Sequence, residues 1–193
     1  MNSQRVELAL FPLSAHILSG GRMSLRIFEP RYVRMVKEAC AGKLEFGICM
    51  LNPKGDKDTN EHIYPLGTHV KVIDFDMLDH GLLGVTVEGL DYFWIDAISN
   101  DADGLRMGQC HWLDAWDYHL PEDEIEQMRL KLKQIFERFP DIRKLYQTPR
   151  FNDPLWVMFR WLELVPVTAS RKQELLQQKD CRKVLSFLTQ LVN

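Results

Sequence analysis

The sequence predicts an α+β fold: a small β-barrel with one inserted helix, followed by a bundle of α-helices. Between residues 6 and 113, short apolar segments with a period of two are separated by turn residues, a pattern typical of a small barrel. After residue 120 the apolar residues follow a helical period instead. We therefore place the barrel subdomain in residues 1–118 and the helical bundle subdomain in residues 119–193.

The barrel half opens with two strands and the inserted helix. Apolar residues alternate over residues 6–13, and again over 23–28 after a Gly-Gly turn. At Pro30 the period changes, and we expect a helix to begin there because proline suits the first helical position. Gly42 can end that helix. Further strands are expected over 46–51, 70–75, 83–87, 92–98 and 107–113, with a polar loop over 52–62 and a hairpin turn over 79–81.

The bundle half carries four predicted helices. Pro121 and the acidic residues after it favour a helix start, since negative charge is stabilised at that end of the helix. The apolar face of this helix continues to Phe139. The later helices begin at polar caps, expected at Asp153, at Ser170 paired with Gln173, and at Asp180.

The charge distribution counts against nucleic-acid binding by the barrel half. Residues 1–120 carry 11 Lys and Arg against 17 Asp and Glu, whereas residues 121–193 carry 13 against 10. An acidic surface repels the phosphate backbone, whose neutralisation provides most of the non-specific affinity for nucleic acid. The basic residues gather instead in the helical half, at Arg143, Lys144, Arg150, Arg171, Lys172, Arg182 and Lys183.

Cysteine usage and hydropathy predict a cytoplasmic protein without a cofactor. Cys40, Cys49, Cys110 and Cys181 are scattered and form no C-x-x-C pair, so we expect reduced, mostly buried thiols. No apolar run has the length of a signal peptide core or of a membrane span. The sequence also lacks the G-x-x-x-x-G-K-[ST] loop that would hold a nucleotide.

Two segments carry a family resemblance. Leu10-Phe11-Pro12-Leu13 and Ile27-Phe28-Glu29-Pro30-Arg31-Tyr32 are similar to the L-F-P-L and I-F-E-P-R-Y motifs of the amino-terminal, substrate-recognition domain of Lon proteases. Weaker matches occur at Phe46-Gly47, at Leu66-Gly67-Thr68, from Gly89 to Phe93, and at Lys172-Gln173-Glu174-Leu175-Leu176. This resemblance implies a PUA-like β-barrel followed by a helical bundle.

The resemblance implies a protein- or peptide-binding module that recognises unfolded or extended polypeptide segments. Because the sequence contains neither a phosphate loop nor a protease domain, we expect a stand-alone, non-catalytic member that acts as an adaptor or regulator of proteolysis. A protease, a chaperone and a second copy of the chain are the other candidate partners. The alternative is an RNA-binding protein, since PUA-like barrels elsewhere bind RNA.

The helix expected from Pro154 to Val165 has almost no polar face. A helix that is apolar all round lies either at the centre of a bundle or against a partner. Tryptophan side chains dominate many protein interfaces. Trp156, Phe159 and Trp161 are therefore candidate peptide-binding residues, with the inner helix of the bundle as the other interpretation.

The signature residues Arg26, Phe28, Glu29, Pro30, Arg31 and Tyr32 are interpreted as architectural. They lie where a strand turns into a helix, and we expect Phe28, Pro30 and Tyr32 to plug one end of the barrel. Glu29 is placed to cap the amide groups of the helix, and Arg26 could pair with it.

The acidic cluster of Asp74, Asp76 and Asp79 with His80 could hold a cation or support an enzyme, but a solvated strand end running into a turn explains it better. Asp56-x-Asp58-x-Asn60 lacks the Gly and Glu of a calcium loop. His111 and His119 have no third ligand nearby in the sequence and are interpreted as structural. The sequence thus predicts no catalytic residue and no metal ligand.

Overall fold

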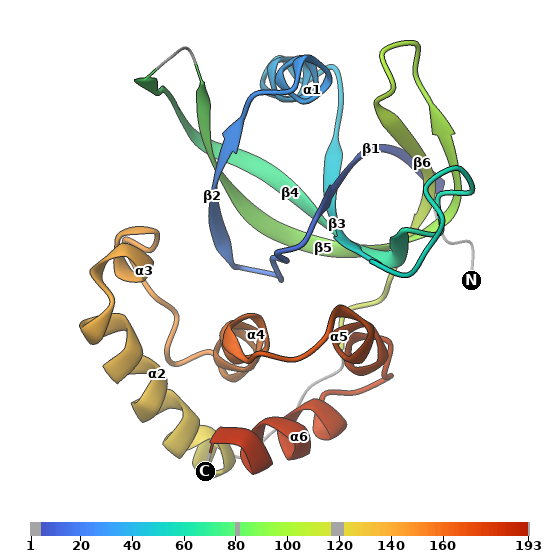
Figure 1. Ribbon diagram of the computed structural model, residues 1–193. Helices are drawn as coiled ribbons and strands as arrows, with labels where there is room; N and C mark the ends of the chain where they lie inside the picture. Colours follow the sequence, from blue (N-terminus) through green and yellow to red (C-terminus); the bar gives the residue numbers. More distant parts are fainter. Residues whose placement is uncertain (1–4, 80–81, 117–121, 193) are drawn as a thin grey trace. The chain divides into compact units, whose positions relative to one another are not determined.

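The computed structural model describes residues 5–79, 82–116 and 122–192, and the chain divides into two compact units, Met1–Ala115 and Trp116–Asn193 (Figure 1). The first unit contains the β-sheet and one helix, and the second contains the other α-helices of the described part. The predicted α+β class is confirmed. The boundary expected after residue 118 falls within 117–121, outside the described residues.

The first unit is built from six strands and helix α1. Their bounds are β1 (Arg5–Leu13), β2 (Arg22–Ile27), α1 (Pro30–Cys40), β3 (Phe46–Leu51), β4 (Ile63–Met77), β5 (Leu83–Asn100) and β6 (Arg106–Trp112). The sheet order is β2-β5-β4-β3-β1-β6, and β6 also pairs with β5. Five strands therefore form a closed circuit, with β2 attached outside it along β5. Only β1 and β3 pair in parallel among the described strands.

Strand β5 differs from the prediction because it continues where two separate strands were expected. The two strands were expected over 83–87 and 92–98, with Gly89 between them. In the structure Gly89 stays in the strand and exchanges backbone hydrogen bonds with the Gly20-Gly21 turn, at 2.8 Å to Gly20 and 2.9 Å to Gly21. A Cβ on Gly89 would overlap the Leu18 carbonyl oxygen. The glycine thus allows a close approach of two backbones and is not a strand break.

Three of the four weaker family motifs, those of the first unit, meet at the ring of Phe93, which is fully buried. A Cβ on Gly67 would lie 2.7 Å from Phe93 Cε2 and closer still to Cζ, and a Cβ on Gly47 would overlap the same ring. Two neighbouring strands therefore carry glycine so that one aromatic ring can lie flat against them. Thr68, beside Gly67, donates a 2.7 Å hydrogen bond from its hydroxyl to the carbonyl oxygen of Ile17.

Helix α1 begins at Pro30, as predicted, and packs against the main core of the first unit. Met35 and Val36 from α1 join the buried cluster that also contains Phe11 and Val87. The helix ends with Gly42 at φ 69°, a left-handed conformation that glycine adopts without strain. The chain then turns directly into β3.

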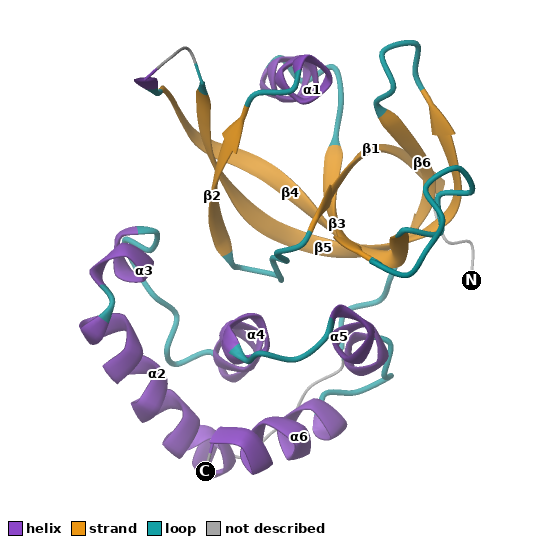
Figure 2. Cartoon of the chain, viewed as in Figure 1, coloured by secondary structure: helices purple, strands orange, loops and turns teal. Residues whose placement is uncertain are grey.

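The second unit consists of a short 3-10 helix and five α-helices in its described part. Their bounds are η2 (Glu122–Ile125), α2 (Glu126–Arg138), α3 (Pro140–Lys144), α4 (Pro154–Leu164), α5 (Ala169–Leu176) and α6 (Arg182–Val192). Helix α4 contacts both α2 and α6 and lies inside the curve that they form (Figure 2). Helix α3 was not predicted, and Pro121 lies outside the described residues.

Of the three caps predicted for the second unit, the cap at Asp153 is confirmed, because its carboxylate accepts a 3.1 Å bond from the backbone N–H of Trp156. The Asp180 carboxylate accepts from Arg182 N at 2.9 Å, but Asp180 lies one residue before Cys181, whose carbonyl accepts the first helical bond, from Leu185 N. The prediction for α5 was wrong: its N-cap is Thr168, whose hydroxyl accepts from Arg171 N at 3.3 Å. No helix in the described ranges combines the length and apolar character needed to cross a membrane.

Candidate functional site

The signature segment forms the corner between β2 and α1. Tyr32 is buried, with its ring centroid 4.3 Å from that of Phe11. The Arg31 guanidinium lies 4.9 Å from the centroid of the Tyr32 ring and donates to the carbonyl oxygen of Gly104 at 3.1 Å. Burial raises the pKa of the Tyr32 hydroxyl. These contacts tie α1 to the β5–β6 turn, which is an architectural role.

Three expectations about this corner were wrong. Glu29 makes no side-chain bond to the helix amides, because its carboxylate accepts a 2.6 Å bond from Arg31 instead. Arg26 is exposed and is not the residue that pairs with Glu29. Phe28 does not plug the barrel: 72% of its surface is exposed. Along β2 the side chains alternate, so the burial of Ile27 turns Phe28 to the other side.

A second ionic cluster at this corner was not anticipated from the sequence. Arg34 in α1 donates to Asp101 at 2.8 Å and to Asp103 at 2.7 Å. The hydrogen bond from Arg34 lowers the pKa of the Asp103 carboxyl. These acids lie about seventy positions further along the chain, so no local pattern could have paired them with Arg34. The three side chains stay partly exposed, which fits a surface contact that orients α1.

The candidate aromatic residues of α4 all point into the second unit. Trp156 packs among Phe136, Tyr146 and Phe151, with ring centroids 5.4–5.9 Å apart. The Trp161 indole N–H donates to the carbonyl oxygen of Met128 at 3.0 Å, and Phe159 stacks 5.5 Å from Trp116. All three candidate side chains are buried. Contact between these rings and a peptide stays a prediction.

The exposed large apolar side chains of the described part of the first unit are Phe28, Ile73, Phe75 and Met77. We call these four residues the hairpin surface, since three of them lie on β4 where it pairs with β5. Phe75 and Met77 are each 66% exposed, and Ile73 is 37% exposed. Phe28 follows Ile27, which pairs with Leu83, and Leu83 also pairs with Met77. The four residues thus gather at one end of the β2-β5-β4 sheet.

The hairpin surface was not predicted from the sequence. Phe75 was interpreted only as one of the residues, with Val70 and Val72, that mark the strand expected over 70–75. One signal was available: Phe75 and Met77 alternate with Asp74 and Asp76 immediately before a turn. Alternating acidic and apolar residues just before a turn indicate that the strand extends beyond the elements that would bury its apolar side chains.

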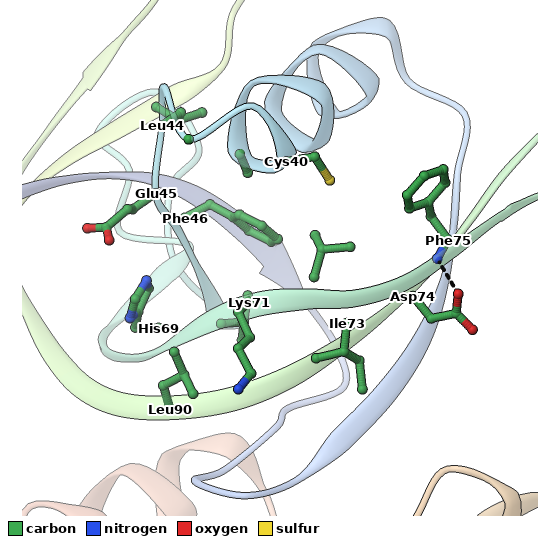
Figure 3. Close-up of a pocket in the computed structure, with 14 residues that line it drawn as sticks. Cys40, Leu44, Glu45, Phe46, His69, Lys71, Ile73, Asp74, Phe75 and Leu90 are labelled. Carbon is green, nitrogen blue, oxygen red and sulfur yellow. Dashed lines mark hydrogen bonds between the residues drawn. The ribbon is translucent and has the colours of Figure 1, made fainter.

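An open cavity of about 650 Å³ adjoins the hairpin surface (Figure 3). Cys40 and Phe46 lie on the same side of β4 as Phe75, whereas Lys71 and Ile73 lie on the opposite side. His69 also lines the cavity, and its burial lowers the pKa of the imidazole. The cavity therefore combines apolar walls with a few polar groups, as ligand-binding cavities commonly do.

The acidic cluster near the turn forms no catalytic arrangement in the described residues. The carboxylates of Asp74 and Asp76 accept bonds from the backbone N–H groups of Phe75 and Met77, at 2.9 Å and 2.8 Å. His80 lies outside the described residues. Across the parts of the chain that the structure describes, no group of three or more His, Cys, Asp or Glu side chains could hold a metal ion.

His111 and His119 were interpreted as structural. His111 Nδ1 lies 3.0 Å from an oxygen of Asp96, and His119 lies outside the described residues.

The thiols of all four cysteines are free; Cys40 is exposed and the other three are buried. Burial raises the pKa of the Cys49 thiol, and raises that of Cys110 to about 12. Such thiols are poor nucleophiles.

The chain has a two-unit α+β fold. It consists of a closed circuit of strands with one inserted helix, followed by a helical unit, and it carries an exposed apolar surface beside a cavity. Comparison with known families makes the assignment specific. The chain belongs to the family of the ATP-dependent protease La (LON) substrate-binding domain, whose profile matches residues 7–193. The resemblance found in the sequence is thus confirmed.

Individual relatives agree with this family. The chain is 28% identical over 98 residues to Lon protease 4 of Sorangium cellulosum (strain So ce56), a match that spans 50% of this chain and 12% of that protein. Its fold is similar to the crystal structure of a Lon N-terminal domain protein from Xanthomonas campestris, with a TM-score of 0.74, 24% identity, and 97% and 99% of the two chains covered.

A second solved structure has the same fold. The N-terminal domain of the Lon protease from Mycobacterium avium complex matches with a TM-score of 0.63 and 13% identity, over 97% of this chain and 98% of that one. At such low identity, these two structures support the fold alone.

Proposed function

We propose that the chain is a non-catalytic module that binds unfolded or extended polypeptide segments through the hairpin surface, and that it acts as an adaptor or regulator of ATP-dependent proteolysis. The gathering of Phe28, Ile73, Phe75 and Met77 at one end of the sheet carries this proposal. Phe75 lines the cavity and lies on the same side of β4 as Met77. Exposed apolar side chains beside a cavity mark sites of interaction with other proteins.

The size of the hairpin surface fits reversible binding. Full burial of one large apolar side chain contributes about 1.5–3 kcal/mol. Phe75 and Met77, which lie on the same side of β4, together therefore offer several kcal/mol, from which the loss of translational and conformational freedom on association must be subtracted. The net affinity suits a module that samples many clients and releases them.

Family membership supports recognition of a substrate, and the residues support the absence of catalysis. The matched family is a substrate-binding domain. The sequence has no phosphate loop, and the buried thiols of Cys49 and Cys110 have raised pKa values. The match to Lon protease 4 spans 12% of that protein, so none of its activity is assigned to this chain.

The proposal is tested with reduced, carboxymethylated α-lactalbumin, which stays unfolded in buffer. We expect the fluorescently labelled chain to bind this unfolded α-lactalbumin, as measured by fluorescence anisotropy. Native α-lactalbumin should not bind to the chain. Replacing both Phe75 and Met77 with serine should weaken binding at least about tenfold, because two apolar side chains are lost from the interface. Both residues are exposed, so the fold should tolerate the change.

The matched control is Leu191→Ser, which removes a side chain that is 53% exposed on α6. It should leave the affinity unchanged. Equal effects of the two variants would contradict a role for the hairpin surface. Binding of a single-stranded RNA oligonucleotide in place of unfolded α-lactalbumin would favour the alternative function.

A further inference from the structure

Strand β4 is longer than its partner β3, and this difference leaves part of β4 with an open side. Pairing between β3 and β4 runs from Leu51 opposite Ile63 to Phe46 opposite Val70. Beyond Val70, β4 continues to Met77 and, among the described strands, pairs with β5 alone. We call residues 71–77 the β4 edge. The backbone of such an edge is available for pairing with another strand.

Two N–H groups of the β4 edge are covered by its own side chains. The N–H of Phe75 donates to the carboxylate of Asp74 at 2.9 Å, and the N–H of Met77 donates to that of Asp76 at 2.8 Å. These groups therefore point away from β5. Carboxylates that bond to the next N–H protect an edge from uncontrolled pairing, and an incoming strand could displace them.

The side chains of the β4 edge alternate in character between the two faces of the sheet. Phe75 and Met77 lie on the face of the buried Val85, which is paired directly with Phe75. Asp74 and Asp76 lie on the other face. Over residues 74–77, one face of the edge is thus apolar and the other is acidic, whereas Lys71 and Ile73 lie on the side opposite Phe75 nearer to β3.

The cavity of about 650 Å³ lies along this edge, with Phe46, the first residue of β3, among the residues that line it (Figure 3). A strand added at the β4 edge would continue the row of β3, since both would pair with the same side of β4. The cavity walls include Cys40 above the edge and Ile73 below it. Space and apolar contacts are therefore present where an added strand would lie.

We propose that the β4 edge binds an extended polypeptide segment by strand addition, and that it prefers a segment in which apolar residues alternate with Lys or Arg. This proposal rests on the proposed function and specifies its binding mode. Apolar residues of the segment would lie beside Phe75 and Met77. Its basic residues would pair with Asp74 and Asp76, whose carboxylates lose their N–H partners when the new strand takes them.

The experiment uses the 193-residue protein and the heptapeptide acetyl-Leu-Lys-Val-Lys-Leu-Lys-Val-amide, with affinity measured by calorimetry. Each of the seven peptide N–H groups is methylated in turn. In an added strand, alternate N–H groups face β4, so methylation at every second position should weaken binding about tenfold, and methylation at the positions between should have little effect. Amide resonances of Phe75 and Met77 should shift on binding.

Charge preference is tested with Asp76→Asn. Replacing lysine with serine throughout the peptide should weaken binding to the parent protein several-fold, and this preference should shrink in the variant. The matched control, Asp58→Asn, makes the same charge change in the exposed loop before β4 and should keep the preference. An equal reduction in both variants would mean that overall charge, not the β4 edge, sets the preference.

The outcomes separate this proposal from the proposed function. If unfolded α-lactalbumin binds but methylation of the heptapeptide weakens binding equally at all positions or at none, strand addition is wrong and the recognition function stands. If neither the unfolded protein nor the heptapeptide binds, the proposed function itself fails. A period-two methylation pattern with shifts at Phe75 and Met77 supports both.

Discussion

Replacing Gly67 with alanine should destabilise the first unit, because the new Cβ has no room beside Phe93. It would lie 2.7 Å from Cε2 and 3.0 Å from Cε1 of the ring, and closer to Cζ. The ring has little freedom to move, since Gly47 on the next strand faces it just as closely. Phe93 is fully buried, so the ring cannot turn toward solvent.

The expected cost follows from two opposing effects. Overpacking a tight core costs about 1–3 kcal/mol. Alanine also lowers the conformational entropy of the unfolded chain, which offsets about 0.4–1 kcal/mol of that loss. We therefore expect Gly67→Ala to lower the free energy of unfolding by about 1–2 kcal/mol.

A double-mutant cycle with Phe93→Leu identifies the cause. Leucine lacks the Cε and Cζ atoms that would meet the new Cβ, so Gly67→Ala should cost little in that background. Urea unfolding, followed by tryptophan fluorescence and circular dichroism, measures all four free energies, with separate transitions fitted if the two signals do not coincide.

The control for this cycle is Gly84→Ala in β5, where a new Cβ would meet atoms of the Leu78 side chain at 3.0–3.2 Å. That flexible side chain can move, so the change should be below about 1 kcal/mol. If Gly67→Ala costs the same with Phe93 and with leucine, the reasoning from ring packing is refuted.

Two further predictions concern the second unit. Trp161→Phe removes the indole N–H that donates to the Met128 carbonyl, and should lower the free energy of unfolding by about 1–3 kcal/mol. The affinity for unfolded α-lactalbumin, measured by anisotropy, should stay unchanged. A loss of affinity would instead place Trp161 in the binding surface. Burial lowers the pKa of the Lys172 ammonium from 10.5 to about 8. Between these two pH values Lys172 is protonated in the unfolded chain but not in the folded one, so the free energy of unfolding should rise with pH. Urea unfolding at several pH values should show this rise reduced in Lys172→Met, and an unchanged slope would contradict it.

Local signals in the sequence predicted the elements well where the physics is local. Pro30 starts α1 and Asp153 caps α4, because each effect acts over a single helical turn. The cap of α5 was misplaced by two residues, since Thr168 and Ser170 both have a hydroxyl that could serve. Only the backbone geometry at Thr168 chooses between them.

Long-range packing accounts for the signature residues in ways that no local pattern could. Gly47, Gly67 and Phe93 are separate weak motifs in the sequence, yet they form one packing unit across three strands. Phe28 belongs to the most specific motif and is nonetheless exposed. An aromatic residue in a family signature can therefore lie on the surface, and its place depends on which side of β2 the core occupies.

The sequence by itself determined the α+β class, the order of strands before helices and the family, because periodicity, turn residues and the signature are properties of neighbouring positions. Only the tertiary structure decided that residues 71–77 keep an open edge. Helix α1 ends at Cys40, and after Gly42 the chain turns into β3 at Phe46, opposite Val70, so no part of β3 reaches the rest of β4. The proposed strand addition uses the apolar and acidic alternation over residues 74–77, and that geometry alone makes the alternation available.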